Sequence, residues 1–209
     1  MQLSDLDLNK TYTYADYLQW TFEERLELIK GKIFKMTPAP NLYHQDMVMA
    51  ISSAIYHYLK GKPCKVYIAP FDVRLPKSAA KETDKVVYTV VQPDVCVICD
   101  VTKLDIKGCI GAPDIVIEIL SPGNNKKELR NKYEVYEESG VKEYWIVSPQ
   151  DKTFLQYTLT DAGRYQASRL MTAGDHVTTP ILPGFVLDLE VIFENIHPEL
   201  WRVSNRASS

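Results

Sequence analysis

Residues 113–120 read PDIVIEIL, an almost continuous apolar run that contains one glutamate, Glu118. A short run rich in Ile and Val and entered through a proline is typical of a strand buried inside a sheet. Residues 124–140 then predict a helix closed by Gly140, and residues 143–149, EYWIVSP, predict the next strand. This order of strand, crossover helix and strand predicts a mixed α/β sheet (an α+β fold) with a helix on at least one face.

The rest of the chain fits the same class. Met47, Ile51 and Ile55 recur at helical spacing and predict a helix over residues 44–61. The other expected elements are a helix over 13–20 capped by Thr13, a helical turn over 21–28 capped by Thr21, a hairpin over 28–36 with Gly31 at its turn, strand regions over 64–75, 86–100 (interrupted by Pro93) and 154–159, and a strand followed by a helical turn over 182–193. We expect one domain over residues 1–209 with its core at about 13–195, a mobile loop at 76–85 and a frayed tail at 203–209.

Composition sets limits on the function. The chain has 209 residues and 45% hydrophobic content, which excludes disorder as its main state. No apolar run approaches the ~20 residues of a membrane helix, and the acidic start MQLSDLDLNK does not resemble a signal peptide, so we predict a cytoplasmic protein without membrane contact. The net charge is −3 and the pI about 5.8, whereas nucleic-acid domains often have a pI above about 9. Binding to DNA would therefore depend on a local basic patch or on metal ions.

The four cysteines do not form a metal-binding pattern. Cys96 and Cys99 make a CxxC, but they lie in a predicted strand, where side chains three residues apart point to opposite faces. Neither Cys64 nor Cys109 supplies a second CxxC. We therefore predict buried, unligated thiols, and we do not expect disulfides in a reducing cytosol.

Glu118 is the most informative residue, because a lone buried carboxylate is costly unless it is paired, protonated or bound to metal. Asp94, in QPDVCVI, stands at the start of the neighbouring predicted strand, so the two carboxylates can lie close enough to share a divalent cation. Asp114 is a rival on the same strand, but four residues at ~3.3 Å each place it ~13 Å from Glu118. A structural hydrogen-bonded pair of Asp94 and Glu118 is the alternative to a metal site.

Lys132, on the predicted helix, lies near the apolar stripe of Leu129, Tyr133 and Tyr136 and is expected to reach the end of the sheet that carries Glu118. Lys126 borders the other edge of that stripe, and a snorkelling surface lysine is the structural alternative for Lys132. Two carboxylates that hold Mg²⁺ and a lysine that stabilises developing negative charge make a workable hydrolytic site.

These residues carry a resemblance to a known group of proteins. Asp94, Glu118 and Lys132 with their surroundings resemble the PD-(D/E)XK nuclease superfamily, and more closely a bacterial family of unknown function described as restriction endonucleases. The matching text is LELIKGKIFKM, PxPxxxH ending at His44, QPDVCVI, APDIVIEILSP, Lys132 with Tyr136, GVKEYWIV and LPGFVLDL. The superfamily usually has its lysine two residues after the acid, where this chain has Leu120, so the lysine has moved to position 132. Ser148 and Glu128 replace two acids that are common in the family.

The resemblance implies a restriction-endonuclease-like fold, a Mg²⁺-dependent endonuclease (Mn²⁺ as an alternative ion) and DNA as substrate. Asp94 and Glu118 would bind the metal, and Lys132 would stabilise the attacking water and the transition state. The resemblance also adds Glu27, as a first-helix acid that supports metal or water, and His44, as a phosphate contact or proton-transfer group. For both residues an ordinary structural role is the alternative.

The interaction partners are less well defined by the sequence. Lysines at 60, 62, 65, 126 and 127 are candidates for contact with the DNA backbone, with plain solubility as the alternative. A homodimer is expected, because such nucleases often place two sites on two strands and isologous pairing is the commonest assembly. A catalytically inactive module that binds DNA or protein, and a metal-dependent hydrolase of RNA or nucleotides, remain as other hypotheses.

Overall fold

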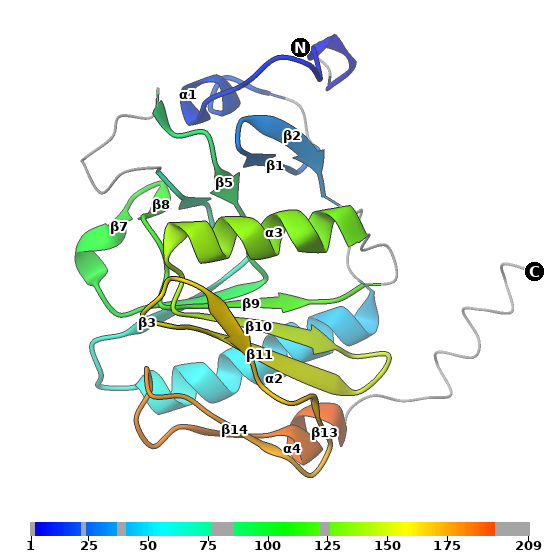
Figure 1. Ribbon diagram of the computed structural model, residues 1–209, viewed down its shortest axis with the longest axis vertical. Coiled ribbons are helices and arrows are strands. Elements are labelled where there is room, and N and C mark those ends of the chain that lie inside the picture. Colours follow the sequence, from blue (N-terminus) through cyan, green and yellow to red (C-terminus); the bar gives the residue numbers. More distant parts are fainter. Residues whose placement is uncertain (1–2, 22–23, 37–40, 77–85, 122–125, 195–209) are drawn as a thin grey trace, which may run out of the picture.

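The computed structural model describes residues 3–21, 24–36, 41–76, 86–121 and 126–194, without the side chains of Ser4 and residues 126–128. It confirms the predicted class, because mixed β-sheets are flanked by helices (Figure 1). Most of the predicted mobile loop and all of the predicted frayed tail lie outside these ranges. Within them, none of the helices combines the length and the apolar character needed to cross a bilayer.

Side chains of cap residues hold the first turns of two of the described helices. They are α1 (Tyr14–Tyr17), α2 (Leu42–Leu59), α3 (Lys126–Ser139) and α4 (Leu189–Glu194), with 3-10 turns η1 (Leu3–Asp5) and η3 (Val101–Lys103). The Thr13 side chain accepts a hydrogen bond from the Asp16 backbone, which confirms the predicted cap of α1. The Asn41 side chain accepts one from the His44 backbone, so α2 begins slightly before the predicted position.

The strands form two large sheets. The seven-stranded sheet has the order β12-β11-β10-β9-β6-β3, with β13 paired to β11. Its members are β3 (Lys65–Ile68), β6 (Val95–Ile98), β9 (Ile115–Ile119), β10 (Glu143–Ser148), β11 (Thr153–Leu159), β12 (Tyr165–Ala167) and β13 (Met171–Thr172). The six-stranded sheet, in the order β2-β1-β5-β4-β8-β7, comprises β1 (Leu26–Ile29), β2 (Lys32–Lys35), β4 (Val73–Arg74), β5 (Val90–Val91), β7 (Leu104–Asp105) and β8 (Gly108–Ile110). A separate pair consists of β14 (His176–Thr178) and β15 (Val186–Asp188).

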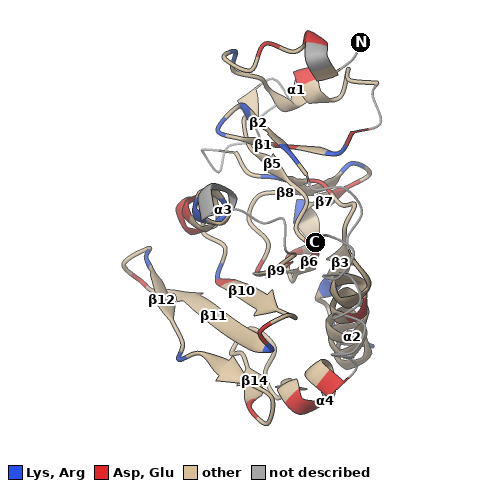
Figure 2. Cartoon of the chain, turned by 90° about the vertical axis from the view of Figure 1, so that its right-hand side faces the viewer, with Lys and Arg blue, Asp and Glu red and all other residues tan. Residues whose placement is uncertain are grey.

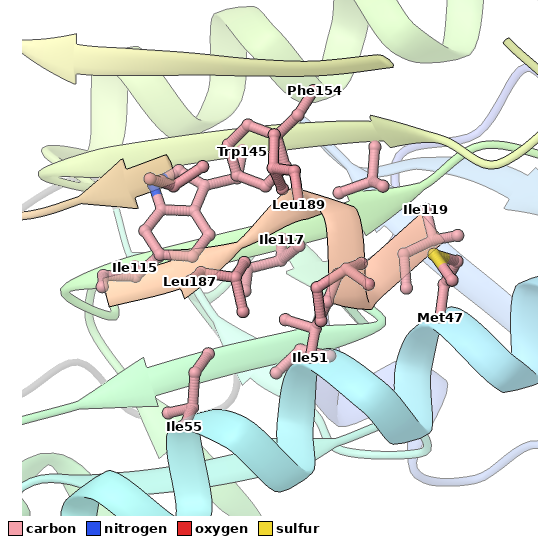
Figure 3. Packing of buried hydrophobic residues seen from close by; sticks show 14 of the residues in the cluster. Met47, Ile51, Ile55, Ile115, Ile117, Ile119, Trp145, Phe154, Leu187 and Leu189 are labelled. Atoms are coloured by element: carbon pink, nitrogen blue, oxygen red, sulfur yellow. The ribbon is translucent and has the colours of Figure 1, made fainter. Parts of the chain in front are cut away.

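Strand β9 is buried over its whole length because helices cover both faces of the seven-stranded sheet. α2 and α3 lie on opposite sides of it (Figure 2). On one face, Ile51 and Ile55 of α2 point towards Ile117 of β9 (Figure 3). On the other face, Val116 belongs to a cluster that also contains Tyr136 of α3 and residues of the six-stranded sheet. β9 runs parallel to β10 and antiparallel to β6, so the sheet is mixed as predicted.

The segment before the first hairpin contradicts the prediction of a helical turn at 21–28. Residues 26–29 form strand β1, which pairs with β2 from Leu26↔Lys35 to Ile29↔Lys32. Lys30 and Gly31 both have positive φ, a backbone suited to a two-residue hairpin turn, and this turn extends the pairing backwards to Leu26. Local acids favour a helix start, but burial of all four β1 residues and the hairpin register prevail.

The prediction that the cysteines stay unpaired is wrong for two of them. Cys64 and Cys99 form a disulfide, whereas Cys96 and Cys109 are free and buried as predicted. The register of β3 and β6 pairs Lys65 with Ile98, so its continuation by one residue places Cys64 opposite Cys99. The two cysteines are 35 residues apart in the chain, which is why local spacing did not reveal the pair.

Truncation of Ile51 tests the packing of α2 on the seven-stranded sheet. Ile51 is fully buried, so we expect Ile51→Ala to lower the free energy of unfolding by about 2–5 kcal/mol, through lost burial and the cavity left behind. Urea unfolding followed by circular dichroism measures this change. Ser53→Ala, at an exposed position of the same helix, is the control and should change the free energy of unfolding by less than about 0.5 kcal/mol. Equal effects of the two substitutions would contradict this packing.

Candidate active site

Two carboxylates meet at one end of the strand pair β6 and β9. The antiparallel register pairs Val95 with Ile117, and its continuation by one residue places Asp94 opposite Glu118. The backbone N–H of Ile119 donates to Asp94 Oδ2 at 2.8 Å, which holds this carboxylate against β9. The structure therefore brings together the two acids that the sequence paired, on adjacent strands.

Lys132 connects Glu118 to a third carboxylate. Its Nζ lies 2.9 Å from Glu118 Oε1 and 3.1 Å from Glu27 Oε1, and the lysine side chain is only 5% exposed. The predicted reach of Lys132 from the helix to the sheet is confirmed, and the alternative of a snorkelling surface lysine is wrong. The lysine is buried because the neighbouring Val135 and Tyr136 of α3 pack into the core between the two sheets.

Glu27 occupies the site but not in the predicted way. We expected a helix acid, whereas Glu27 lies in β1, the strand that replaces the predicted helical turn. Its Oε1 also accepts a hydrogen bond of 2.8 Å from the backbone N–H of Gln92, at the end of β5. The solvated alternative is excluded too, since Glu27 is only 2% exposed. The acid thus comes to the site from the six-stranded sheet.

His44 lies in the first turn of α2 beside Asp94. Its Nε2 is 3.1 Å from Asp94 Oδ2, and its backbone N–H donates to the cap residue Asn41. The Nδ1 atom is buried and has no hydrogen-bond partner within the part of the chain that the structure describes. His44 therefore has both its helix-start hydrogen bond and a direct contact with a site acid.

Tyr136 is a residue of this site that the sequence analysis placed on the apolar stripe of the helix and in the family resemblance, without giving it a role in the site. Its hydroxyl donates to Glu118 Oε1 at 2.7 Å, and its ring is fully buried. The available signal was its position four residues after Lys132, which places both side chains on one side of α3. Gln92, which binds Glu27, was also missed, although it directly precedes Pro93 and Asp94.

Burial and crowding of charge shift the protonation equilibria. Burial raises the pKa of the Glu118 carboxyl; Lys132 opposes this rise, while Asp94 and Glu27 add to it, and the net change is upwards. For Lys132, burial alone lowers the pKa, but Glu118 and Glu27 outweigh it and raise the pKa well above its usual value. Lys132 is therefore a permanent cation in this structure.

The other candidates lie elsewhere or outside the described side chains. Asp114, the rival acid, accepts a hydrogen bond from the Cys99 backbone at 2.7 Å and pairs with Lys142 at 2.7 Å, next to the opposite end of β9. The Lys62 ammonium lies 3.0 Å from the centre of the Tyr58 ring at the far end of α2. Lys60 and Lys65 are exposed close to it, and the side chains at 126 and 127 are not described.

The donor set fits a hard divalent cation with few protein ligands. Glu118 Oε2 and Asp94 Oδ1 accept no hydrogen bond from any described residue, so each carboxylate keeps one oxygen available. Among the residues that the structure describes, no group of three or more His, Cys, Asp or Glu side chains has metal-binding geometry. Mg²⁺ commonly takes one or two carboxylates and completes its shell with water and substrate oxygens, so two available carboxylates suit it.

A mixed sheet flanked by helices, with one acid on a strand, a second directly before the adjacent strand and a lysine on the crossover helix, defines a restriction-endonuclease-like protein. The chain belongs to the Uma2 family, described as "Putative restriction endonuclease", because residues 14–190 match that family.

The chain is similar to a solved structure and to a second bacterial protein. A crystal structure of a "putative nuclease belonging to DUF820" from Anabaena variabilis ATCC 29413 superposes with a TM-score of 0.69 at 19% identity, over 87% of this chain and 97% of that chain, which supports the fold. An uncharacterized protein of Synechocystis sp. is 26% identical over 161 residues, which cover 73% of this chain and 80% of the relative.

Removal of the buried cation tests the charge network. We expect Lys132→Met to lower the free energy of unfolding by about 3–5 kcal/mol, because Glu27 and Glu118 lose their shared partner while they stay buried. Adding Glu118→Gln to this variant removes one of the stranded charges and should restore part of the loss. Urea unfolding of the native chain, Lys132→Met, Glu118→Gln and the double variant measures the coupling. A double variant as unstable as the sum of its single variants would show that the two side chains do not interact.

Proposed function

We propose that this protein is a divalent-metal-dependent nuclease that hydrolyses phosphodiester bonds in DNA. The observation that carries the proposal is the position of Asp94 opposite Glu118 on adjacent strands, with the Lys132 ammonium 2.9 Å from Glu118. Membership of the Uma2 family supports the nuclease class. The ion and the substrate are part of the proposal.

In this proposal Asp94 and Glu118 hold Mg²⁺, with Mn²⁺ as the alternative ion. When bound, the metal would polarise the phosphate and lower the pKa of a bound water so that it becomes a nucleophile near neutral pH. The Ile119 backbone and His44 fix the orientation of Asp94, while Lys132 and Tyr136 fix Glu118 by both bonding to Oε1. The oxygen that each carboxylate leaves without a hydrogen-bond donor among the described residues would be the one available to the metal.

Lys132 serves as an electrostatic group and not as a proton acceptor. Its raised pKa keeps the ammonium charged at neutral pH, so it cannot take a proton from water. A fixed positive charge beside the metal carboxylates favours the negative charge that develops on the phosphate in the transition state. Glu27 holds this ammonium from the other side and so positions it.

Two observations favour a second candidate, a nuclease fold kept as a binding scaffold. Glu118 Oε1 already has two partners, and Lys132 has two carboxylates, so the network is satisfied without a metal. The net charge of −3 also opposes DNA binding by simple electrostatics. In that case the charge network would only stabilise the contact between the two sheets.

Calorimetric titration with MgCl₂ and MnCl₂ distinguishes the two candidates. We expect saturable binding by the native chain and its loss in Asp94→Asn and in Glu118→Gln, since each substitution removes a charged oxygen ligand and nearly conserves shape. Glu190→Gln, at an exposed position of α4, is the matched control and should bind as the native chain does. Absence of binding in the native chain, both alone and with a DNA duplex present, would favour the scaffold.

Cleavage assays test the substrate. With Mg²⁺ present we expect the native chain to cut DNA, and Asp94→Asn to cut at least about 100-fold more slowly, which is the scale on which enzymes lose rate when one charge-stabilising group is removed. EDTA should abolish the activity. RNA of the same sequence and free nucleotides are run in parallel, and cleavage of these alone would replace DNA as the proposed substrate.

Sedimentation tests the proposed homodimer, which would bring one site to each strand of a duplex.

A further inference from the structure

The site contains more negative than positive charge, and this excess would repel the phosphates of a nucleic acid. Glu27, Asp94 and Glu118 contribute three carboxylates, and Lys132 supplies a cation that two of them already share. A metal ion offsets part of this charge, but the phosphates on either side of the one that is cut would still meet an acidic environment. A nuclease with this site therefore needs a further cation at its rim.

Arg25 is an exposed cation that Gln92 connects to the site. It precedes Glu27 by two residues, and its backbone carbonyl continues the β1–β2 pairing by accepting a hydrogen bond from Met36. Its Nη2 and Nε donate to the side-chain oxygen of Gln92 at 2.7 and 3.3 Å. The same Gln92 donates its backbone N–H to Glu27, so one residue connects the guanidinium to the site.

The charge of Arg25 is not neutralised by an ion pair. The other arginines with described side chains each pair with a carboxylate, and these pairs are Arg74–Asp105, Arg130–Glu134, Arg164–Glu137 and Arg169–Asp175. Arg25 instead binds a neutral amide oxygen, and among the described residues no carboxylate lies within ion-pair distance of it. A guanidinium has five N–H donors, and the contacts to Gln92 use two, so the rest are available to an anion.

The orientation of the Gln92 amide is fixed by its other neighbour. Its Nε2 donates to Asp72 Oδ1 at 2.8 Å, while the Tyr14 hydroxyl donates to Asp72 Oδ2 at 2.9 Å. A carboxylate only accepts hydrogen bonds, so the amide nitrogen must face Asp72 and the amide oxygen must face Arg25. Gln92 is only 8% exposed, and this buried contact holds the exposed guanidinium in place without cancelling its charge.

We propose that Arg25 binds a non-bridging phosphate oxygen of the nucleic-acid backbone beside the bond that is cut, with Gln92 as its positioning residue. This inference rests on the proposed nuclease function and adds a substrate-binding residue to it. Arginine suits this task because its planar fork of donors matches the geometry of a phosphate.

Binding of a labelled DNA duplex, followed by fluorescence anisotropy over a range of salt concentrations, both in EDTA and with Ca²⁺ in place of Mg²⁺, tests the proposal on the full chain. Arg25→Gln is expected to weaken binding by about tenfold or more and to reduce the slope of log K against log salt by about 1, since one phosphate contact is lost. Arg169→Gln removes the same charge from an exposed pair with Asp175 and should leave the slope unchanged. Gln92→Met keeps the guanidinium but not its support, so it should lower affinity at a nearly unchanged slope.

The outcomes separate this inference from the proposed function. If Arg25→Gln behaves like Arg169→Gln in both affinity and slope, Arg25 is not a phosphate ligand and the inference is wrong, while metal binding and cleavage by the native chain are unaffected by that result. Arg25→Gln should also bind Mg²⁺ as the native chain does, because it is not a metal ligand. A native chain that binds metal but shows no salt-dependent binding to DNA would overturn both the inference and DNA as the substrate.

Discussion

One buried ammonium group connects the parts of the structure that form the candidate site. Lys132 contacts Glu118 of the seven-stranded sheet and Glu27 of the six-stranded sheet, so one cation on α3 joins the two sheets at the point where their charged residues meet. Buried ion pairs are seldom more stabilising than apolar residues of the same volume, because desolvation offsets most of their attraction. Stability alone therefore does not explain why these charges are buried here, whereas the proposed function gives them a task, because it needs fixed metal ligands and a fixed cation.

Burial of a carboxylate does not by itself identify a functional group, as Glu143 shows. Glu143 lies in β10 and is 1% exposed, yet Trp145, Gln156 and Thr179 all donate hydrogen bonds to it. These donors are neutral side chains, and they satisfy the carboxylate with no other ionised group beside it in the described contacts. Glu118 differs, because a lysine and two other acids surround it and leave one of its oxygens without a donor. Glu118 and Glu143 are both buried, and they differ in the charged groups that surround them.

The sequence was enough to predict the three central residues of the candidate site, but not the strand that carries Glu27 or the contacts of Gln92. Asp94, Glu118 and Lys132 could be predicted because they lie in strongly periodic segments whose neighbours in the sheet follow from chain order. Glu27 was assigned to the wrong element, since local acids favoured a helix whereas pairing with β2 makes residues 26–29 a strand. Its partner Gln92 is 65 residues away in the chain, so local patterns did not reveal that contact. The Cys64–Cys99 pair and the six-stranded sheet depend on register between distant segments, which single-chain patterns do not encode.

The groups of the site come from separate parts of the chain: Glu27 from β1, His44 from α2, Asp94 and Glu118 from the ends of β6 and β9, and Lys132 from α3. No single supersecondary unit holds more than a fraction of them. A partly folded chain, in which α3 has not docked or the hairpin has not closed, would have its carboxylates far apart and solvated. The arrangement of these side chains is therefore a property of the complete native state, and it forms in the same cooperative step that completes the tertiary structure.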